Sequence, residues 1–409
     1  MSAAPAAVFV MPEQGHFQRM RAVIAGLATR GPVHVFADRR FQEAIEAAGG
    51  TFVDMFGKYP LADADDSSVP VPCRYVTYAG VYAEPVIEEL RRIGPSVVVY
   101  DMFAVIAHVA ARALGIPYVN VCAGHAVDPA RFLAMVKAVK QKRVSQACHA
   151  AVEALRERHG LLDASPFSYI TSGLSPHLNI YCEPPEFITE DERRPLEPLG
   201  FYGSLAPTAQ LEARELDTSP SEFGTEPAEL QVYVAFGTVV WRYWTEQAAS
   251  TLTAISEALA ARDDARAVVS LGGCAVDAEL IEAFARPNVT VARWVDQWRI
   301  LRDADVFVTH HGLNSTHEAI YRDVPMISYP FANDQPGMAR RCRELGLAVP
   351  LAEEPRGAVT PKDVETALAE VSAERDSLRA GLARARGWEL EVMARRGAVL
   401  DQISSLAET

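Results

Sequence analysis

The stretch AVFVMPEQGHFQRMRAVIAGLATRGPVHVFA, residues 7–37, decides the fold of the amino-terminal half. It opens with an apolar run at 7–11 that lacks polar alternation, as strands buried on both faces do. A polar loop, a helical pattern over 17–29 and a second apolar run at 33–37 follow. A strand, a helix and another strand in this order predict a β-α-β unit with parallel strands.

The same alternation continues along the chain, with further apolar runs at residues 96–100, 118–122, 231–236, 267–271, 289–292, 306–309 and 326–329. Residues 207–227 interrupt it with Pro, Ser, Thr and acidic residues that have no apolar period, which predicts a linker. We therefore predict an α/β protein with two facing Rossmann-like parallel-sheet domains, residues 1–206 and 228–386, and a cleft between them. Ligands of such sheets bind at the carboxyl ends of the strands.

The composition excludes several classes of protein. The 409 residues include 39 basic and 53 acidic side chains, a net charge of -14, which argues against nucleic acid or an anionic membrane as a partner. The six cysteines contain no C-x-x-C pair, so free thiols in a reducing compartment are expected. The amino terminus lacks the basic flank of a signal peptide, and no apolar run is long enough to span a membrane. The sequence predicts a cytoplasmic protein.

Chemically informative residues gather in the second half, in Trp294-Val-Asp-Gln297, in THHGLNSTHE at 309–318 and in PFANDQ at 330–335. The turn after the strand at 306–309 carries His310 and Gly312 and leads into a helix. Helix amino termini favour phosphate because they present unpaired N–H groups and a positive dipole end. Each part alone also has an ordinary explanation, since Asn or Ser before a helix commonly caps it and a lone Trp is commonly core. Their occurrence together and in this order favours a binding site.

These stretches resemble the nucleotide-sugar signature of the family 1 glycosyltransferases of GT-B fold, a group with plant and bacterial antibiotic members. The plant form has W-A-P-Q, then H-C-G-W-N-S-T-x-E, then D-Q. The residues that match it are Trp294, Gln297, His310, Gly312, Asn314, Ser315, Thr316, Glu318, Asp334 and Gln335. Gly237 and Thr238, after the strand at 231–236, match the family's S-F-G-S/T loop.

The resemblance implies a role for each matching position. Trp294 is expected to stack on the base, Gln297 to contact the nucleoside and Glu318 to bind the ribose. The diphosphate is expected at the Gly237–Thr238 loop and at His310, Asn314 and Ser315, and the sugar hydroxyls at Asp334 and Gln335. Three positions depart from the plant pattern, namely Asp296 for Pro, His311 for Cys and Leu313 for Trp.

The first half carries the counterpart of the family's catalytic base. Gly15 and His16 match its G-H-x-x-P motif, whereas Arg19 occupies the position of the Pro, which predicts a loop of different shape. Asp101 follows a predicted strand, at the position of the family's His-bonded Asp. A histidine that titrates near neutrality, oriented by a carboxylate, can deprotonate a hydroxyl as it attacks. Other histidines remain alternatives: His108 lies in an apolar helical pattern typical of core, and His125 follows a strand.

The resemblance implies an inverting, metal-independent transfer of a hexose from a nucleoside-diphosphate sugar to a hydroxyl of a small-molecule natural product. UDP is favoured as the nucleotide and dTDP stays open. No metal or other cofactor is expected, because the Asp-x-Asp pair of Asp63 and Asp65 lies in an acidic, Ser-rich loop and not at a strand end. The helix at 387–409 is expected to cross back to the first domain.

Some questions stay open at this stage. A nucleotide-sugar epimerase of similar fold and a non-catalytic donor-binding partner are the alternative functions, and the protein is expected to be a monomer or a homodimer. Residues 125–175 form a largely helical insertion that lines an acceptor pocket or packs on its own domain. Its apolar residues are Phe132, Met135, Val136, Phe167 and Tyr169.

Overall fold

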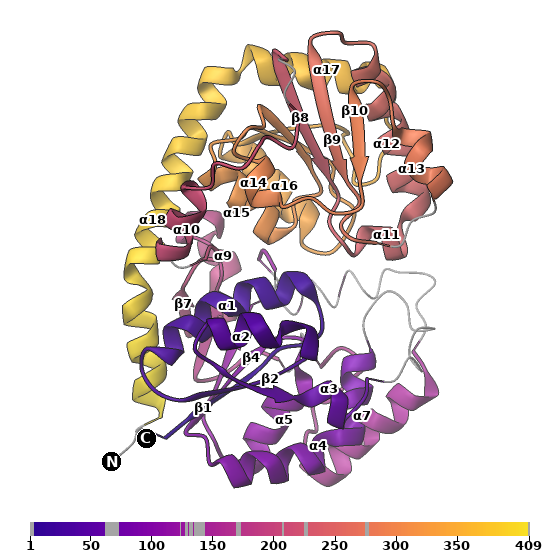
Figure 1. The fold of residues 1–409 in the computed structure, drawn as a ribbon. Coiled ribbons are helices and arrows are strands. Elements are labelled where there is room, and N and C mark those ends of the chain that lie inside the picture. Colours follow the sequence, from indigo (N-terminus) through magenta and orange to yellow (C-terminus); the bar gives the residue numbers. More distant parts are fainter. Residues whose placement is uncertain are drawn as a thin grey trace. The chain divides into compact units, whose positions relative to one another are not determined.

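The structure, a computed structural model, divides into two compact units (Figure 1). The first comprises Met1–Pro207 and Val392–Thr409, and the second comprises Thr208–Glu391. The residues that the structure describes are 4–61, 73–122, 124–126, 130, 134, 144–168, 173–206, 208–224, 228–274 and 278–407.

Each unit is built on one parallel sheet. The first sheet has the order β3-β2-β1-β4-β5-β6-β7. Its strands are β1 (Ala6–Phe9), β2 (Val33–Ala37), β3 (Thr51–Asp54), β4 (Val97–Asp101), β5 (Tyr118–Val121), β6 (Leu178–Tyr181) and β7 (Leu199–Phe201). The second sheet has the order β10-β9-β8-β11-β12-β13. Its strands are β8 (Leu230–Ala235), β9 (Ala265–Ser270), β10 (Val289–Ala292), β11 (Val306–Thr309), β12 (Met326–Ser328) and β13 (Ala348–Pro350).

Helices connect the strands within each unit. Those of the first unit are α1 (Gln14–Ala28), α2 (Gln42–Ala47), α3 (Met55–Lys58), α4 (Arg74–Ile93), α5 (Val105–Leu114), α7 (Gln146–His159) and α9 (Glu190–Arg193), with 3-10 turns at Arg39–Phe41, Pro185–Phe187 and Arg194–Leu196. Those of the second unit are α10 (Thr208–Glu215), α11 (Val240–Tyr243), α12 (Thr245–Ala260), α13 (Ala278–Phe284), α14 (Gln297–Ile300), α15 (Leu313–Tyr321), α16 (Gln335–Glu344) and α17 (Pro361–Ala373). Helix α18 (Arg375–Leu406) begins in the second unit, and its residues from Val392 belong to the first.

The strands form because their side chains are apolar on both faces. In the first unit, Phe9 and Tyr100 are fully buried on neighbouring strands and belong to one core cluster with residues of α4, α5 and α7. Burial of aromatic and branched side chains on both sides of a sheet accounts for the continuous apolar runs in the sequence. The predicted α/β class with two Rossmann-like parallel sheets is confirmed.

The predicted strands at 33–37, 289–292 and 306–309 coincide with β2, β10 and β11, and the other predicted runs overlap a strand within one or two residues. Strands β3, β6, β7 and β13 were not predicted. Their sequences, TFVD, LNIY, LGF and AVP, each include a polar residue, a Gly or a Pro, so none stands out as an apolar run.

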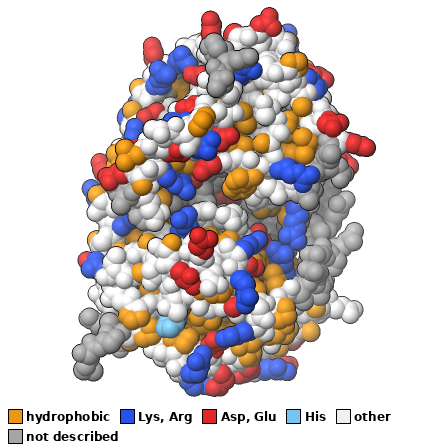
Figure 2. Space-filling view, in the orientation of Figure 1, with side chains coloured by type: hydrophobic (Ala, Val, Ile, Leu, Met, Phe, Trp, Pro, Cys, Tyr) orange, Lys and Arg blue, Asp and Glu red, His pale blue; other side chains and the backbone are white. Residues whose placement is uncertain are grey.

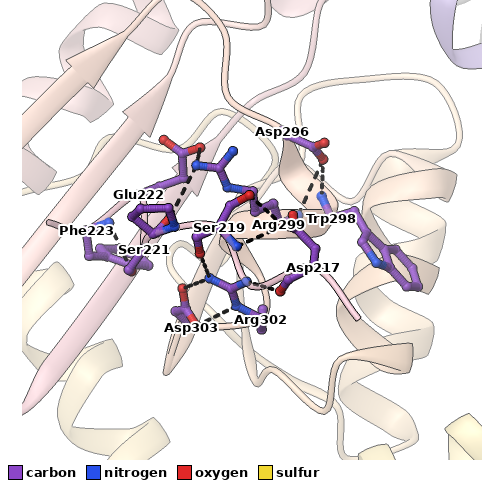
Figure 3. A network of polar contacts seen from close by, with 11 residues as sticks. Asp217, Ser219, Ser221, Glu222, Phe223, Asp296, Trp298, Arg299, Arg302 and Asp303 are labelled. Atoms are coloured by element: carbon purple, nitrogen blue, oxygen red, sulfur yellow. Dashed lines mark hydrogen bonds and ion pairs between the residues drawn. The ribbon is translucent and has the colours of Figure 1, made fainter. Parts of the chain in front are cut away.

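The segment that we predict as a linker contains a helix and a network of polar contacts in the second unit. Residues 208–215 form α10, and the following residues are held by two arginines near α14 (Figure 3). Arg302 donates to the carbonyls of Asp217 and Ser219, at 2.7 and 3.0 Å. Arg299 donates to the Pro220 carbonyl at 3.2 Å and forms an ion pair with Glu222 at 2.9 Å. The composition of this segment cannot reveal that it is ordered, because the arginines that hold it lie about 80 residues away in sequence.

The surface is charged and mixed, and Figure 2 shows acidic and basic side chains interspersed on the visible face. Within the described ranges, no helix combines the length and the apolar character that crossing a bilayer requires.

The network around Arg302 leads to the first prediction. Replacing Arg302 by Ala removes both hydrogen bonds to the backbone at 217–219, so this segment should open more readily and be cut sooner by a protease. Limited proteolysis with mass spectrometry of the fragments measures the effect. Arg286→Ala is the matched control, because the Arg286 side chain donates to the carbonyls of Ala283 and Ala285, close to it in sequence at the end of α13. Equal cleavage rates in the two variants would contradict the role given to Arg302.

Candidate active site

A histidine and a carboxylate meet at the carboxyl edge of the first sheet. His16 Nδ1 lies 2.7 and 2.8 Å from the two carboxylate oxygens of Asp101. Asp101 is buried, whereas the His16 side chain remains 16% exposed. The carboxylate therefore engages Nδ1, and Nε2 is the ring nitrogen left for a reacting group.

Strand pairing brings these two residues together. Strands β1 and β4 are parallel neighbours with Phe9 opposite Tyr100, so the residues beyond both strands emerge at the same edge. Helix α1 begins at Gln14, three residues earlier than predicted, and His16 lies in its first turn. The Phe103 ring packs 4.3 Å from the His16 ring, and the Phe103 N–H donates to Asp101 at 3.3 Å.

The two alternative histidines have other surroundings. His108 is 1% exposed inside α5, and burial lowers its pKa to about 3, so it is a neutral core residue as expected. His125 is also buried, and its Nδ1 lies 3.2 Å from both carboxylate oxygens of Glu183. Neither shares the partial exposure of His16.

In the second unit, His310 packs against the backbone of two loops. A Cβ atom added at either Gly237 or Gly312 would lie 2.5 Å from His310 Nε2, so both positions exclude any side chain. Gly237 also has φ of 72°, which glycine adopts at little cost. The loop after β8 and the turn after β11 thus meet at this imidazole.

The structure adds a third loop, after β9, which we did not predict as part of the site. A Cβ at Gly272 would lie 2.4 Å from the carbonyl oxygen of Gly237, and one at Gly273 would lie 3.4 Å from the Trp294 ring. Two consecutive glycines directly after a predicted strand were the available signal. Trp294 itself is 59% exposed, which contradicts the ordinary explanation of a core tryptophan.

Three predicted donor residues form a hydrogen-bonded chain. Gln297 Nε2 donates to Glu318 at 2.7 Å, and the Ser315 hydroxyl donates to the Gln297 carbonyl oxygen at 3.1 Å. Asp296, which departs from the plant pattern, caps α14 by accepting from the Trp298 and Arg299 N–H groups (Figure 3). It therefore orients Gln297, the first residue of that helix.

The amino terminus of α15 is open to a ligand. Its N-cap is Gly312, which has no side chain to cap the first N–H groups, so Asn314 and Ser315 lie inside the first turn. The ordinary explanation of these two residues as N-caps is therefore wrong. An uncapped helix terminus beside a glycine is the arrangement that binds phosphate.

Burial shifts the pKa values of two titratable side chains in this region. The pKa of Glu318 is raised by burial, and the Gln297 amide opposes the shift. The pKa of His310 is lowered by burial to about 4, so this imidazole is neutral at neutral pH. A neutral His310 contributes one N–H donor rather than a positive charge.

The last predicted pair follows β12. Asp334 is the N-cap residue of α16, and Gln335 begins that helix. The Gln335 side-chain oxygen accepts from the N–H groups of Phe331 and Ala332, at 2.8 and 3.2 Å. These two hydrogen bonds fix the orientation of the Gln335 amide. Its NH₂ group then points away from them and can donate to other partners. The predicted residues Asp63, Asp65, Phe132, Met135, Val136 and Tyr169 lie outside the described residues.

Comparison with known proteins agrees with the resemblance. Residues 217–377 match the model of the UDP-glucoronosyl and UDP-glucosyl transferase family. The NDP-glycosyltransferase YjiC of Bacillus subtilis is 25% identical over 95% of this chain and 97% of its own. The chain is a glycosyltransferase that is similar to these family 1 proteins.

Solved glycosyltransferases share the fold of the whole chain. The glycotransferase of kitacinnamycin superposes with a TM-score of 0.75 at 23% identity and full coverage of both chains. The glycosyltransferase VinC in complex with dTDP superposes with a TM-score of 0.64 at 19% identity over 99% of each chain. These likenesses confirm the predicted GT-B fold. The epimerase and the non-catalytic partner, kept as alternatives above, find no support among these matches.

The structure also explains a departure of this glycosyltransferase from the plant signature. His311, where plants have Cys, is fully buried with a left-handed φ of 59°. Its Nδ1 lies 3.1 Å from the Thr316 hydroxyl, and its Nε2 lies 2.7 Å from the Ser328 hydroxyl. The side chain thus ties the turn to α15 and β12, which compensates a backbone conformation that costs about 1 kcal/mol or more.

The packing around His310 gives a second prediction. Gly312→Ala introduces a methyl group 2.5 Å from His310 Nε2, although φ at this position is an ordinary -63°. The turn must shift, and we expect UDP affinity, measured by calorimetry, to fall about tenfold or more.

Gly346→Ala is the control for this prediction. At Gly346 φ is 70° and an added Cβ would have no atom within 4 Å, so the substitution strains the backbone without a clash. Gly346→Ala should lower stability by about 1 kcal/mol and leave UDP affinity unchanged. Equal UDP affinity in both variants would show that the clash has no effect on donor binding.

Proposed function

We propose that this glycosyltransferase inverts the anomeric carbon of a nucleoside-diphosphate hexose as it transfers the sugar to a hydroxyl of a small-molecule natural product. The single observation that carries the proposal is the 2.7 Å contact between His16 Nδ1 and Asp101. The carboxylate holds the proton on Nδ1, so Nε2 carries the lone pair that accepts the acceptor's hydroxyl proton. The positive charge that forms on the ring is stabilised by Asp101.

The reaction is then a single displacement. The acceptor oxygen attacks the anomeric carbon, its proton passes to His16 Nε2, and the bond to the β-phosphate oxygen breaks on the opposite face. One displacement of this kind inverts the configuration. Negative charge develops on the leaving diphosphate, and the residues that support its stabilisation are the uncapped terminus of α15, the neutral His310 and Ser315. Helix-end N–H groups and a hydroxyl can balance this charge without a metal, so we propose that transfer needs no metal or other cofactor.

The donor is proposed to be a UDP-sugar. Glu318, held by Gln297, can accept from ribose hydroxyls, and UDP offers a 2′-hydroxyl that dTDP lacks. The match to the UDP-glucoronosyl and UDP-glucosyl transferase model favours the same nucleotide. VinC, whose structure contains dTDP, keeps the second nucleotide open. Asp334 and Gln335 are proposed to contact the sugar hydroxyls, with Trp294 on the base.

The acceptor is proposed from a related structure. The glycotransferase of kitacinnamycin shares this fold, and a natural product that carries a hydroxyl is the corresponding substrate class. We propose that the protein acts in the cytoplasm, alone or as a homodimer.

His16→Ala removes the proposed base. Transfer should fall by about 10²- to 10⁴-fold, the usual contribution of general base catalysis, while UDP affinity stays the same. Product formation is measured by mass spectrometry with a UDP-hexose and a panel of hydroxylated acceptors. His149→Ala, which changes an exposed histidine of α7, is the control and should keep full activity. Undiminished turnover by His16→Ala would remove this residue from the mechanism.

Glu318→Ala tests the nucleotide preference. The wild-type enzyme should bind UDP more tightly than dTDP, and the variant should lose most of that difference because the ribose acceptor is gone. Calorimetric titration with both nucleotides measures it. Glu365→Ala, on the exposed face of α17, serves as the control. If the ratio of the two affinities is the same in all three proteins, Glu318 has no part in ribose recognition.

A further inference from the structure

Arg19 is a buried arginine without a hydrogen-bonding partner. It lies in α1 one turn after His16, occupies the position of the family's Pro, and is only 6% exposed. Across the described part of the chain, its guanidinium makes no hydrogen bond or ion pair. Arg396 of the same unit provides a comparison, since it is 9% exposed and donates to the carbonyls of Tyr202 and Leu205 at 2.7 Å each.

An arginine in this state is costly to the protein unless something else binds it. The guanidinium carries a permanent charge and five N–H donors in a planar fork. At 6% exposure Arg19 has lost most of its hydration without gaining a partner, yet none of its nitrogens is among the fully buried atoms that lack one. An oxyanion such as a carboxylate fits the fork with two parallel hydrogen bonds and is the group that it selects.

The carboxylates of the protein near Cys182 do not serve as the oxyanion that pairs with Arg19. Burial raises the pKa of the Cys182 thiol to about 12, and Arg19 is the strongest charge that opposes the shift. Glu183 and Asp101 act on the same sulfur in the opposite sense, so the guanidinium shares the surroundings of Cys182 with both carboxylates. It is hydrogen-bonded to neither of them.

Both carboxylates already have other partners. Asp101 accepts from His16, as described above. Glu183 is fully buried between His125, whose Nδ1 lies 3.2 Å from each oxygen, and the Tyr181 hydroxyl. The Tyr181 hydroxyl also accepts from the N–H of Ala126 at 3.0 Å. Neither acid therefore uses the N–H donors of Arg19, which stay available to a ligand.

The position of Arg19 relative to His16 indicates which ligand this is. Residues three apart on a helix share a face, with Cβ atoms about 5–6 Å apart. A small molecule whose hydroxyl contacts His16 can therefore present a second group to Arg19. This relation lies within one helix of one unit and does not depend on the second unit.

We propose that Arg19 binds a carboxylate of the acceptor, and that the enzyme selects hydroxy acids over their neutral analogues. This inference rests on the proposed function, in which His16 receives the acceptor's hydroxyl proton. Arg19 is then a specificity residue. A Pro at this position, as in the family motif, carries no charge and selects no acid.

The test compares matched acceptor pairs. Calorimetry on the UDP-bound enzyme measures the affinity for 4-hydroxybenzoate, 4-hydroxyphenylacetate and 4-hydroxycinnamate, each beside its primary amide. In the wild-type enzyme at least one acid should bind more tightly than its amide. In Arg19→Met that preference should fall by about 10- to 100-fold, the range of a charge-assisted hydrogen-bonded pair. Arg19→Lys keeps the charge without the fork and should retain an intermediate preference.

Controls separate this role from general effects of charge. Arg39→Met removes an exposed cation of the same unit that pairs with Asp54, and it should leave the acid preference intact. UDP affinity should be the same in all four proteins. A loss of UDP affinity in Arg19→Met, with the acid preference unchanged, would assign Arg19 to the donor diphosphate and overturn the proposal.

Two further outcomes are decisive. If no acid binds the wild-type enzyme better than its amide, the proposal is wrong. Transfer to a neutral phenol by His16→Ala tests the proposed function separately. Unchanged transfer there would defeat His16 as the base, whereas an acid preference that depends on Arg19 could still be measured by binding.

Discussion

Parallel strand pairing is the constraint on which the active site depends. All strands of a parallel sheet end at the same edge. The sheet alone therefore brings residues that follow different strands close together. In the first unit, the pairing of β1 with β4 brings His16 and Asp101 to 2.7 Å from one another. In the second unit, the loops after β8 and β11 meet at His310 in the same way, and the loop after β9 packs against the loop after β8.

Close packing of the backbone sets the shape of the donor site. Gly237, Gly272 and Gly312 allow loops to approach to distances that any side chain would prevent. The buried His310 fills the remaining space and stays neutral, since burial disfavours its charged form. His311 fixes the same turn from the other side through two hydroxyl groups. Rigid donors that need no rearrangement are what a leaving diphosphate requires.

Much of this could be predicted from the sequence, and the limits have physical causes. The apolar runs predicted β1, β2, β4, β5 and β8–β12, because strands buried on both faces carry a local signal. The pairing of His16 with Asp101 was expected from the family resemblance, and the structure shows their hydrogen bond. The donor-binding roles, which come from the same resemblance, stay predictions. Strands β3 and β7 were missed because Thr51, Asp54 and Gly200 interrupt their short apolar runs.

Features that depend on distant partners could not be found in this way. The order of the segment after α10 comes from Arg299 and Arg302, and the burial of Arg19 comes from the packing of α1 on its sheet. The start of α1 was also predicted three residues too late, because PEQG at 12–15 has the composition of a loop. Local composition describes a segment's own preferences and not the surface on which it packs.

The membership of α18 in both units has a practical consequence for exchanging halves between related enzymes. Residues 1–207 alone do not complete the first unit, because Leu400 and Ile403 are buried in it and Arg396 satisfies two of its carbonyls. A chimera joined only between Pro207 and Thr208 would combine the amino-terminal half of one parent with a tail evolved for another. Hybrids should therefore carry two junctions, the second near Val392, so that the final turns of the helix stay with the sheet that they cover.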